Sequence, residues 1–282
     1  MKFDKLFRRF PTVADLVVMV LLFFVSQMFV GFVAQAIGFV APETMPIGEV
    51  DVELYTAQQI ALGRYVAVLY PLSMLFSIAV MWAYLRARSG KKPIRIRYSV
   101  SGFNPTVVLV GVVWLLAAQI LLEPLMALLP PSDGRGIGKG VWACVTAMVS
   151  APIFEELLCR GLLFETIRKR WGATTTIFIS SLFFGLMHLD VATAMVAVVA
   201  GIIFGVLYVR TSSLFTTIII HSLNNAMAFA LISFGVGDVS LKEILGGGTG
   251  YWVVYGVAVV IFVACCIEAY FRVFRTREVP QS

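Results

Sequence analysis

The chain has 282 residues, of which 60% are hydrophobic and 13% are charged, with a mean hydropathy of +0.91 and a formal net charge of +6. This balance excludes a soluble globular domain of this length and indicates a polytopic membrane protein. The positive charge is therefore interpreted as a record of membrane topology and not as a sign of nucleic-acid binding.

The apolar segments predict an all-α fold with about eight transmembrane helices. The first apolar run is longer than the core of a signal peptide and is interpreted as a retained helix. Without internal repeats, the chain is predicted to form a single integral membrane domain over residues 1–282, with a catalytic core at 140–234. The predicted spans are 13–40, 58–85, 105–129, 139–170, 174–188, 191–208, 213–234 and 251–274.

The basic residues are concentrated on one side of the predicted membrane. Most of the 22 Lys and Arg residues fall in the N-terminal segment and in alternate loops, with the densest group in residues 86–97. Because cytoplasmic loops are enriched in Lys and Arg, this asymmetry predicts that both termini are cytoplasmic. The four cysteines show no metal-ligand spacing and are interpreted as packing residues.

Three charged residues, Glu155, Glu156 and Arg160, lie inside the predicted span 139–170. An ionisable group at bilayer depth costs at least about 2.5 kcal/mol, so such residues indicate a functional site. Glu156 and Arg160 are four residues apart and are predicted to pair along the helix. Glu155 points about 100° away and is predicted to lack this cationic partner, which suits a general base for water.

Both histidines of the chain, His188 and His221, fall within predicted spans. Asn225 follows His221 by four residues and shares its helix face. Counted from the cytoplasmic helix ends, Glu155 and the two histidines lie roughly 17 to 23 Å deep, near the middle of a hydrocarbon core about 30 Å thick. These residues are therefore predicted to meet in one enclosed, hydrated site.

Three motifs occur in order on separate predicted helices: Glu155-Glu156-x-x-x-Arg160, Phe184-x-x-x-His188 and His221-x-x-x-Asn225. Together they resemble the motifs of the CPBP intramembrane proteases, also called the type II CAAX prenyl endopeptidase or Abi family. A segment at 205–214, before His221, also resembles the lead-in of that family.

The resemblance implies an intramembrane endopeptidase in which Glu155 and His188 position and deprotonate the attacking water. His221 and Asn225 would stabilise the oxyanion. Glu156, Arg160 and Phe184 would support these groups. The implied substrates are membrane-tethered proteins or peptides, prenylated CAAX-type proteins among them, and the implied location is the plasma membrane of a prokaryote.

Two alternatives for the cofactor remain open. Glu155, His188 and His221 together match a three-ligand zinc site with an open fourth position. A water activated by a glutamate alone would need no metal. The chain has no HExxH sequence, the usual helical zinc signature.

Two other functions compete with proteolysis. A proton- or ion-coupled transporter also uses Glu and His at the membrane midplane, but it favours internal repeats, which the sequence lacks. A non-catalytic membrane protein for self-immunity against bacteriocins would keep the fold without the reaction. The GxGD sequence at 235–238 is interpreted as a turn and not as an aspartyl protease motif.

Several further polar residues are given structural interpretations. Asn224 lies off the His221 face and is predicted to bond a neighbouring helix. Glu268 is predicted to pair with Arg272 at the next turn of its helix. Gly201 and Gly205 form a GxxxG pair that favours close helix packing. Residues predicted to lie near a membrane interface are Glu123 and Arg64.

Overall fold

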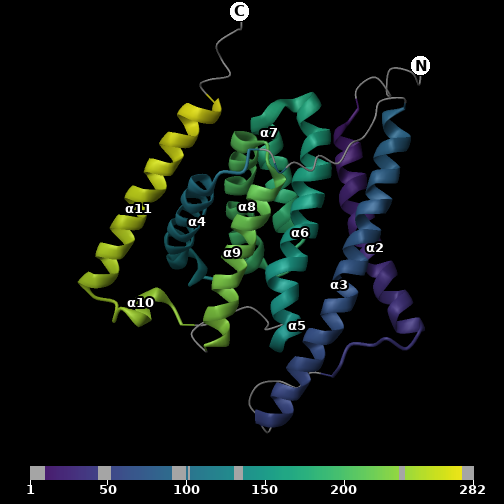
Figure 1. The fold of residues 1–282 in the computed structure, drawn as a ribbon, viewed down its shortest axis with the longest axis horizontal. Coiled ribbons are helices and arrows are strands. Elements are labelled where there is room, and N and C mark those ends of the chain that lie inside the picture. Colours follow the sequence, from purple (N-terminus) through teal and green to yellow (C-terminus); the bar gives the residue numbers. More distant parts are fainter. Residues whose placement is uncertain are drawn as a thin grey trace, which may run out of the picture. The chain divides into compact units, whose positions relative to one another are not determined.

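The computed structural model describes residues 10–43, 52–90, 100, 102–129, 136–234 and 239–274. Every regular element within these ranges is a helix (Figure 1), which confirms the all-α class. The α-helices are α2 (Val13–Ala36), α3 (Val52–Ser89), α4 (Pro105–Met126), α5 (Gly140–Val145), α6 (Ala151–Glu156), α7 (Glu165–Leu186), α8 (Val191–Thr211), α9 (Leu214–Ser233), α10 (Leu241–Ile244) and α11 (Thr249–Ala269). The π-helical segments are η1 (Thr146–Ser150), η2 (Leu157–Phe164) and η3 (Tyr270–Phe274).

Seven helices among the described residues are long and apolar enough to cross a membrane. One of them, Gly140–Leu186, has 47 residues and is interrupted at Gly172, which has φ 73° and ψ −179°. Glycine adopts this left-handed conformation without the steric penalty that a Cβ would bring. The interruption falls between the predicted spans 139–170 and 174–188, so this one stretch contains both of them.

Polar side chains at the helix starts explain several element boundaries. Thr12 and Asp15 form a capping box at the start of α2, each side chain accepting the backbone N–H of the other residue. Asn104 caps α4, whose first residue is Pro105, and Ser213 caps α9 through the Thr216 N–H. These caps satisfy N–H groups that the helix itself leaves without partners.

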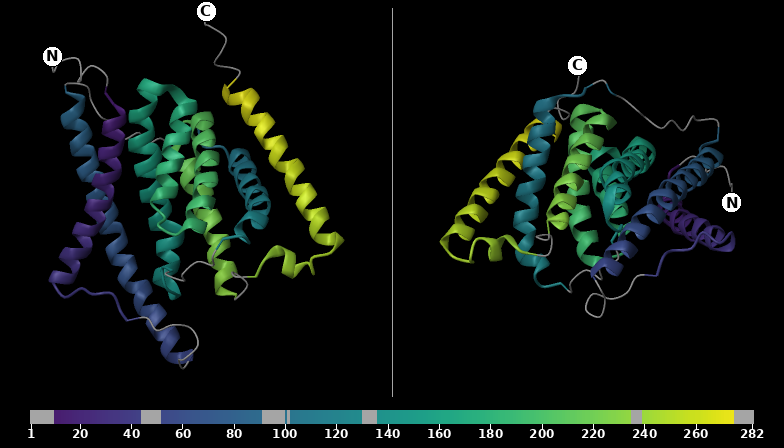
Figure 2. Two further views of the ribbon diagram at one scale, coloured as in Figure 1. Left: turned by 180° about the vertical axis from the view of Figure 1, so that it is seen from behind. Right: turned by 60° about the horizontal axis from the view of Figure 1, so that its bottom comes forward.

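The chain divides into two compact units, residues 1–97 with 134–172 and residues 98–133 with 173–282. In the first unit, α3 packs against α2, α5, η1 and α6. In the second unit, α4 packs against α8, α9 and α11 (Figure 2), and α8 packs against α9. Each unit therefore has its own helix packing.

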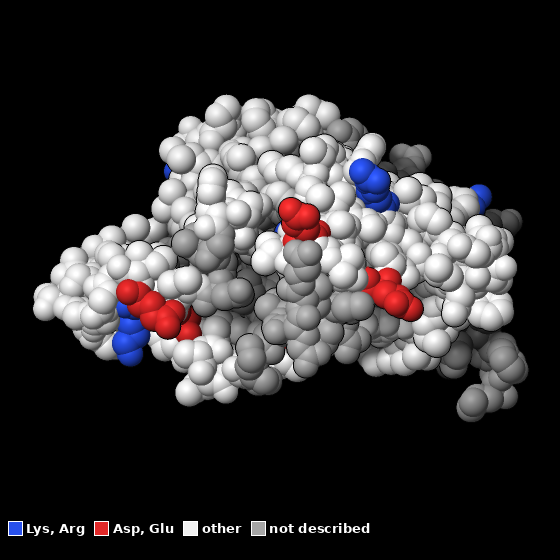
Figure 3. Space-filling view, turned by 90° about the horizontal axis from the view of Figure 1, so that it is seen from below, with Lys and Arg blue, Asp and Glu red and all other residues white. Residues whose placement is uncertain are grey.

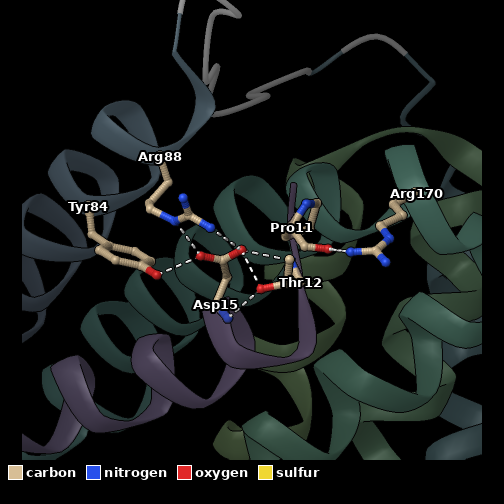
Figure 4. Close-up of polar contacts among 6 residues, drawn as sticks. All are labelled: Pro11, Thr12, Asp15, Tyr84, Arg88 and Arg170. Atoms are coloured by element: carbon tan, nitrogen blue, oxygen red, sulfur yellow. Dashed lines mark hydrogen bonds and ion pairs between the residues drawn. The ribbon is translucent and has the colours of Figure 1, made fainter. Parts of the chain in front are cut away.

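A buried ion pair joins α2 to α3 in the first unit (Figure 4). The Asp15 carboxylate accepts hydrogen bonds from Arg88 Nε at 2.7 Å and from the Tyr84 hydroxyl at 2.6 Å. Asp15 is only 1% exposed. Arg170 of α7 donates to the carbonyl of Pro11, just before α2. The contacts hold the start of α2 against two helices distant in sequence.

Close packing at glycines defines the second unit. A Cβ on Gly201 would lie 3.1 Å from Ser181 Cα, and one on Gly205 would lie 3.2 Å from Ile177 Cγ2. Both contacts join α8 to the part of α7 that follows Gly172, which confirms the prediction that this GxxxG pair serves helix packing. This packing supports the end of α7, which carries Phe184 and is followed by His188.

The orientation in the membrane stays a prediction. Much of its basis, in residues 1–9 and 91–99, lies outside the described residues, as does the GxGD sequence at 235–238. Among the described residues, the face drawn in Figure 3 is mostly uncharged, with a few acidic and basic side chains.

Candidate active site

The two carboxylates of the first motif lie in a short α-helix, α6, between two π-helical segments, η1 and η2. Pro152 has no N–H and so removes one ordinary helical hydrogen bond. The preceding N–H, of Ala151, donates to the carbonyl of Thr146, five residues back. The backbone just before Pro152 is thus π-helical, and π-helical turns are frequent at functional sites.

The predicted pairing of Glu156 with Arg160 is confirmed. Arg160 Nη1 lies 2.8 Å from Glu156 Oε1, and both side chains are 0% exposed. The opposite charges compensate each other where neither is solvated, which is how ionic groups are tolerated in a buried position. This pair can hold the helix segment around Glu155 without taking part in chemistry.

Glu155 has a partner that the sequence interpretation missed. The Tyr70 hydroxyl of α3 donates a hydrogen bond to Glu155 Oε1 at 2.6 Å, and Glu155 is 7% exposed. Arg160 pairs with Glu156, as predicted, while a tyrosine from another helix orients the Glu155 carboxylate. A short hydrogen bond from a neutral donor fixes the position of one carboxylate oxygen.

His188 does not lie inside a helix, contrary to the prediction. The helix α7 ends at Leu186, so His188 lies two residues beyond it, in the short connection to α8. The apolar run continues through Met187 and Leu189, so hydropathy gives no sign of the helix end. The depth obtained by counting helical residues therefore does not apply to His188.

Asp190 marks where the next helix begins. Its side chain accepts the Thr193 N–H at 2.8 Å and caps α8. The hydrogen bonds from the Thr193 hydroxyl and backbone hold the pKa of the exposed Asp190 carboxyl below its usual range. An Asp before an apolar run is a helix-start signal, and it could have located the end of α7 from the sequence.

The tautomer of His188 is set by the main chain. Its Nδ1 lies 2.8 Å from the carbonyl oxygen of Phe184. A carbonyl only accepts, so Nδ1 carries the proton and donates it. In the neutral ring the lone pair then lies on Nε2, which is the atom able to accept a hydrogen bond from water.

Two phenylalanines hold His221 in the second unit. The Phe204 ring stacks on the His221 ring with centroids 4.9 Å apart, and the Phe184 ring meets it edge-on at 5.6 Å. Phe184 also contacts the His188 ring at 5.1 Å. His221 is 4% exposed. Phe184 thus contacts both histidine rings, and the sequence interpretation did not include Phe204.

Asn225 lies one turn after His221 on α9 and belongs to a chain of amides. Gln119 of α4 donates to Asn224 Oδ1 at 2.6 Å, which confirms that Asn224 bonds a neighbouring helix. Asn224 Nδ2 in turn lies 3.4 Å from Asn225 Oδ1. The Asn225 oxygen is thus the acceptor in this contact, and its NH₂ group is a hydrogen-bond donor.

The structure thus brings the predicted residues together in two groups. Glu155, Glu156 and Arg160 lie in the first unit. The second group, in the other unit, comprises Phe184, His188, His221 and Asn225. Within each unit, and for the described residues only, no group of three or more His, Cys, Asp or Glu side chains is placed to hold a metal ion. Glu155 lies in one unit and His188 and His221 lie in the other, so no step is derived through a metal.

Three further polar residues of the sequence analysis, Glu268, Glu123 and Arg64, are placed as follows. Glu268 Oε1 pairs with Arg272 Nε at 2.9 Å, as predicted, and its other oxygen pairs with Arg210 Nη1 at 2.8 Å. Glu123 accepts the backbone N–H of Lys242 at 3.0 Å, next to the connection between α9 and α11. Arg64 is exposed on α3.

Comparison with known proteins places the motifs in one family. Residues 137–227 match the family described as "Type II CAAX prenyl endopeptidase Rce1-like". These residues carry the CAAX protease signature. The CAAX protease segment runs from the residues before α5 into α9 and includes the first-motif carboxylates, both histidines and Asn225.

No curated protein and no solved structure gives a match. The apolar helices and the match of residues 137–227 indicate an integral membrane protein that is similar, over those residues, to CAAX-type proteases.

Proposed function

We propose that the protein is an intramembrane endopeptidase that hydrolyses a peptide bond in membrane-associated proteins or peptides, of which prenylated CAAX-type proteins are the first class to test. The match of residues 137–227 to the CAAX protease family carries this proposal, because that segment holds every proposed catalytic residue. The proposed location is the plasma membrane of a prokaryote, with both termini in the cytoplasm. The family match favours proteolysis over transport or a non-catalytic immunity function.

In the proposed reaction, Glu155 removes a proton from a water molecule that also donates a hydrogen bond to His188 Nε2. The water oxygen then attacks the carbonyl carbon of the scissile peptide bond. His221 and the NH₂ group of Asn225 donate to the oxyanion of the tetrahedral intermediate. The proton held by Glu155 passes to the leaving nitrogen as the carbon–nitrogen bond breaks, which restores the carboxylate.

The environment of each group favours this division of roles. Glu155 is buried and held by a neutral hydroxyl, so it is an acceptor suited to a proton. His188 presents Nε2 because its Nδ1 is used by the main chain. Asn225 presents donors because its oxygen faces Asn224. Glu156 and Arg160 compensate each other and are proposed to be structural supports.

The test of this function is a cleavage assay. The full-length protein, reconstituted in liposomes with a farnesylated peptide ending in a CAAX sequence, is expected to release the C-terminal tripeptide, measured by mass spectrometry. The same assay with a non-prenylated transmembrane peptide tests the broader substrate class. Cleavage that survives exhaustive chelation agrees with a glutamate-activated water, and failure to cleave either peptide would contradict the proposal.

Tyr70 is proposed as a positioning residue for Glu155, and Tyr70→Phe tests it. Loss of one hydrogen bond to a carboxylate is expected to lower kcat roughly tenfold with KM unchanged, since the bond orients the base and does not bind substrate. The matched control is Tyr65→Phe, because Tyr65 lies on the same helix and stacks on Phe39. Equal kcat values for the two variants would contradict the role of Tyr70.

A further inference from the structure

A polar cavity lies at one end of the second unit, away from the Phe184, His188 and His221 cluster. It has a volume of about 490 Å³. The cavity is open to the surface and is lined by the start of α4, the end of α8 and the π-helical segment η3, so three membrane-crossing helices end or begin beside it. Its lining residues are Gly102, Asn104, Val107, Arg210, Thr211 and Arg272.

Two guanidinium groups face one carboxylate in this cavity. Arg210 and Arg272 each bind a different oxygen of Glu268, at 2.8 and 2.9 Å. The cluster thus brings two guanidinium groups onto one carboxylate. The Arg210 side chain is 18% exposed and the Arg272 side chain is 64% exposed. Arginine presents a planar set of donors whose geometry matches phosphate oxygens.

The backbone around the cavity is built for close contact. Gly102 has φ +89°, and a Cβ there would collide with the carbonyl oxygen of Thr211, so only glycine lets the two chain segments meet. Asn104 begins α4 and accepts the N–H of Thr106 at 2.8 Å. The start of a 22-residue helix adds partial positive charge to that of the two arginines.

The position of the cavity along the helices places it at a membrane surface. The neighbouring Tyr270 and Phe271 are 55% and 47% exposed. Exposed aromatic residues at the end of a transmembrane helix are typical of the headgroup region. Basic pockets between transmembrane helices at this depth bind anionic headgroups.

We propose that the cavity between α4, α8 and η3 binds a phosphate-bearing anion, held by Arg210 and Arg272. The phosphate comes either from the headgroup of an anionic lipid or from a free phosphate ester. Glu268 competes with this anion for the same two guanidinium groups and so lowers the affinity of the cavity for the anion. The site is separate from the proposed catalytic residues and does not depend on the proposed proteolysis.

The test measures binding of fluorescent phosphatidylglycerol to the full-length protein in a neutral detergent. Arg272→Gln is expected to weaken binding roughly tenfold, because one charge-assisted contact is lost from an exposed side chain whose removal leaves the fold intact. Glu268→Gln is expected to tighten binding several-fold, since it removes the competing carboxylate. If the ion cluster has only a structural role, Glu268→Gln is expected to give no gain in lipid affinity.

The control variant is Arg64→Gln, which removes an equal charge from an exposed position on α3 and is expected to leave affinity unchanged. Displacement of the lipid by millimolar inorganic phosphate would assign the phosphate group itself, and its failure to displace would assign the lipid headgroup. Equal affinity for phosphatidylcholine, or equal losses in Arg272→Gln and Arg64→Gln, would overturn the proposal.

Discussion

Glu155→Gln is expected to lower kcat/KM for peptide cleavage by roughly 10³-fold, within the range that general acid–base catalysis contributes. The substitution removes only the ability to take a proton. The amide oxygen of Gln can still accept the Tyr70 hydroxyl hydrogen bond, so the position of the side chain is retained. The loss should therefore appear in catalysis and not in protein yield or thermal stability.

The assay compares Glu155→Gln with Glu123→Gln, which alters a carboxylate that contacts the backbone of Lys242 and no proposed catalytic residue. The control is expected to cleave at the wild-type rate. Undiminished cleavage by Glu155→Gln would remove Glu155 from the mechanism. Because this variant should bind substrate without turning it over, proteins that copurify with it identify the substrate.

Arg160→Met is expected to destabilise the protein by about 3 to 5 kcal/mol, because it leaves the Glu156 carboxylate buried without the guanidinium that compensates it. Both side chains are 0% exposed, so water cannot replace the lost interaction. The measurement is the thermal midpoint of the protein in detergent. The second substitution, Glu156→Leu added to Arg160→Met, is expected to recover most of the loss, since it removes the uncompensated charge.

The matched control is Arg272→Met, which removes another arginine four residues after its glutamate. Its ion pair with Glu268 is largely exposed, so the expected loss is less than about 1 kcal/mol. If the double variant remains as unstable as Arg160→Met, Arg160 has a role other than compensating Glu156.

Contacts within one helix were predictable from the sequence, and contacts between helices were not. The pairs Glu156 with Arg160 and Glu268 with Arg272 follow from four-residue spacing, which the helix fixes. Tyr70 lies 85 residues before Glu155. No local spacing connects them. A tyrosine beside Pro71 inside an apolar span was the only signal, and it does not name a partner.

Helix existence was predictable, whereas helix ends and helix type were less so. Hydropathy located the spans because a bilayer requires long apolar segments. The same signal placed His188 inside a helix, since hydropathy does not record where the backbone stops its hydrogen bonds. Gly172 was visible as a break because the charged residues before it already end the apolar run.

The π-helical turns around α6 determine the direction in which the reactive carboxylate points. In η1 the Ala151 N–H reaches the carbonyl five residues back, where an α-helix would reach four. Taking the extra residue out of such a turn rotates the rest of the helix by about 100°. The π-helical hydrogen bonds of η1 therefore determine that Glu155 points toward Tyr70. A one-residue deletion in η1 is expected to turn Glu155 away from Tyr70 and abolish activity, although every proposed catalytic residue is still present.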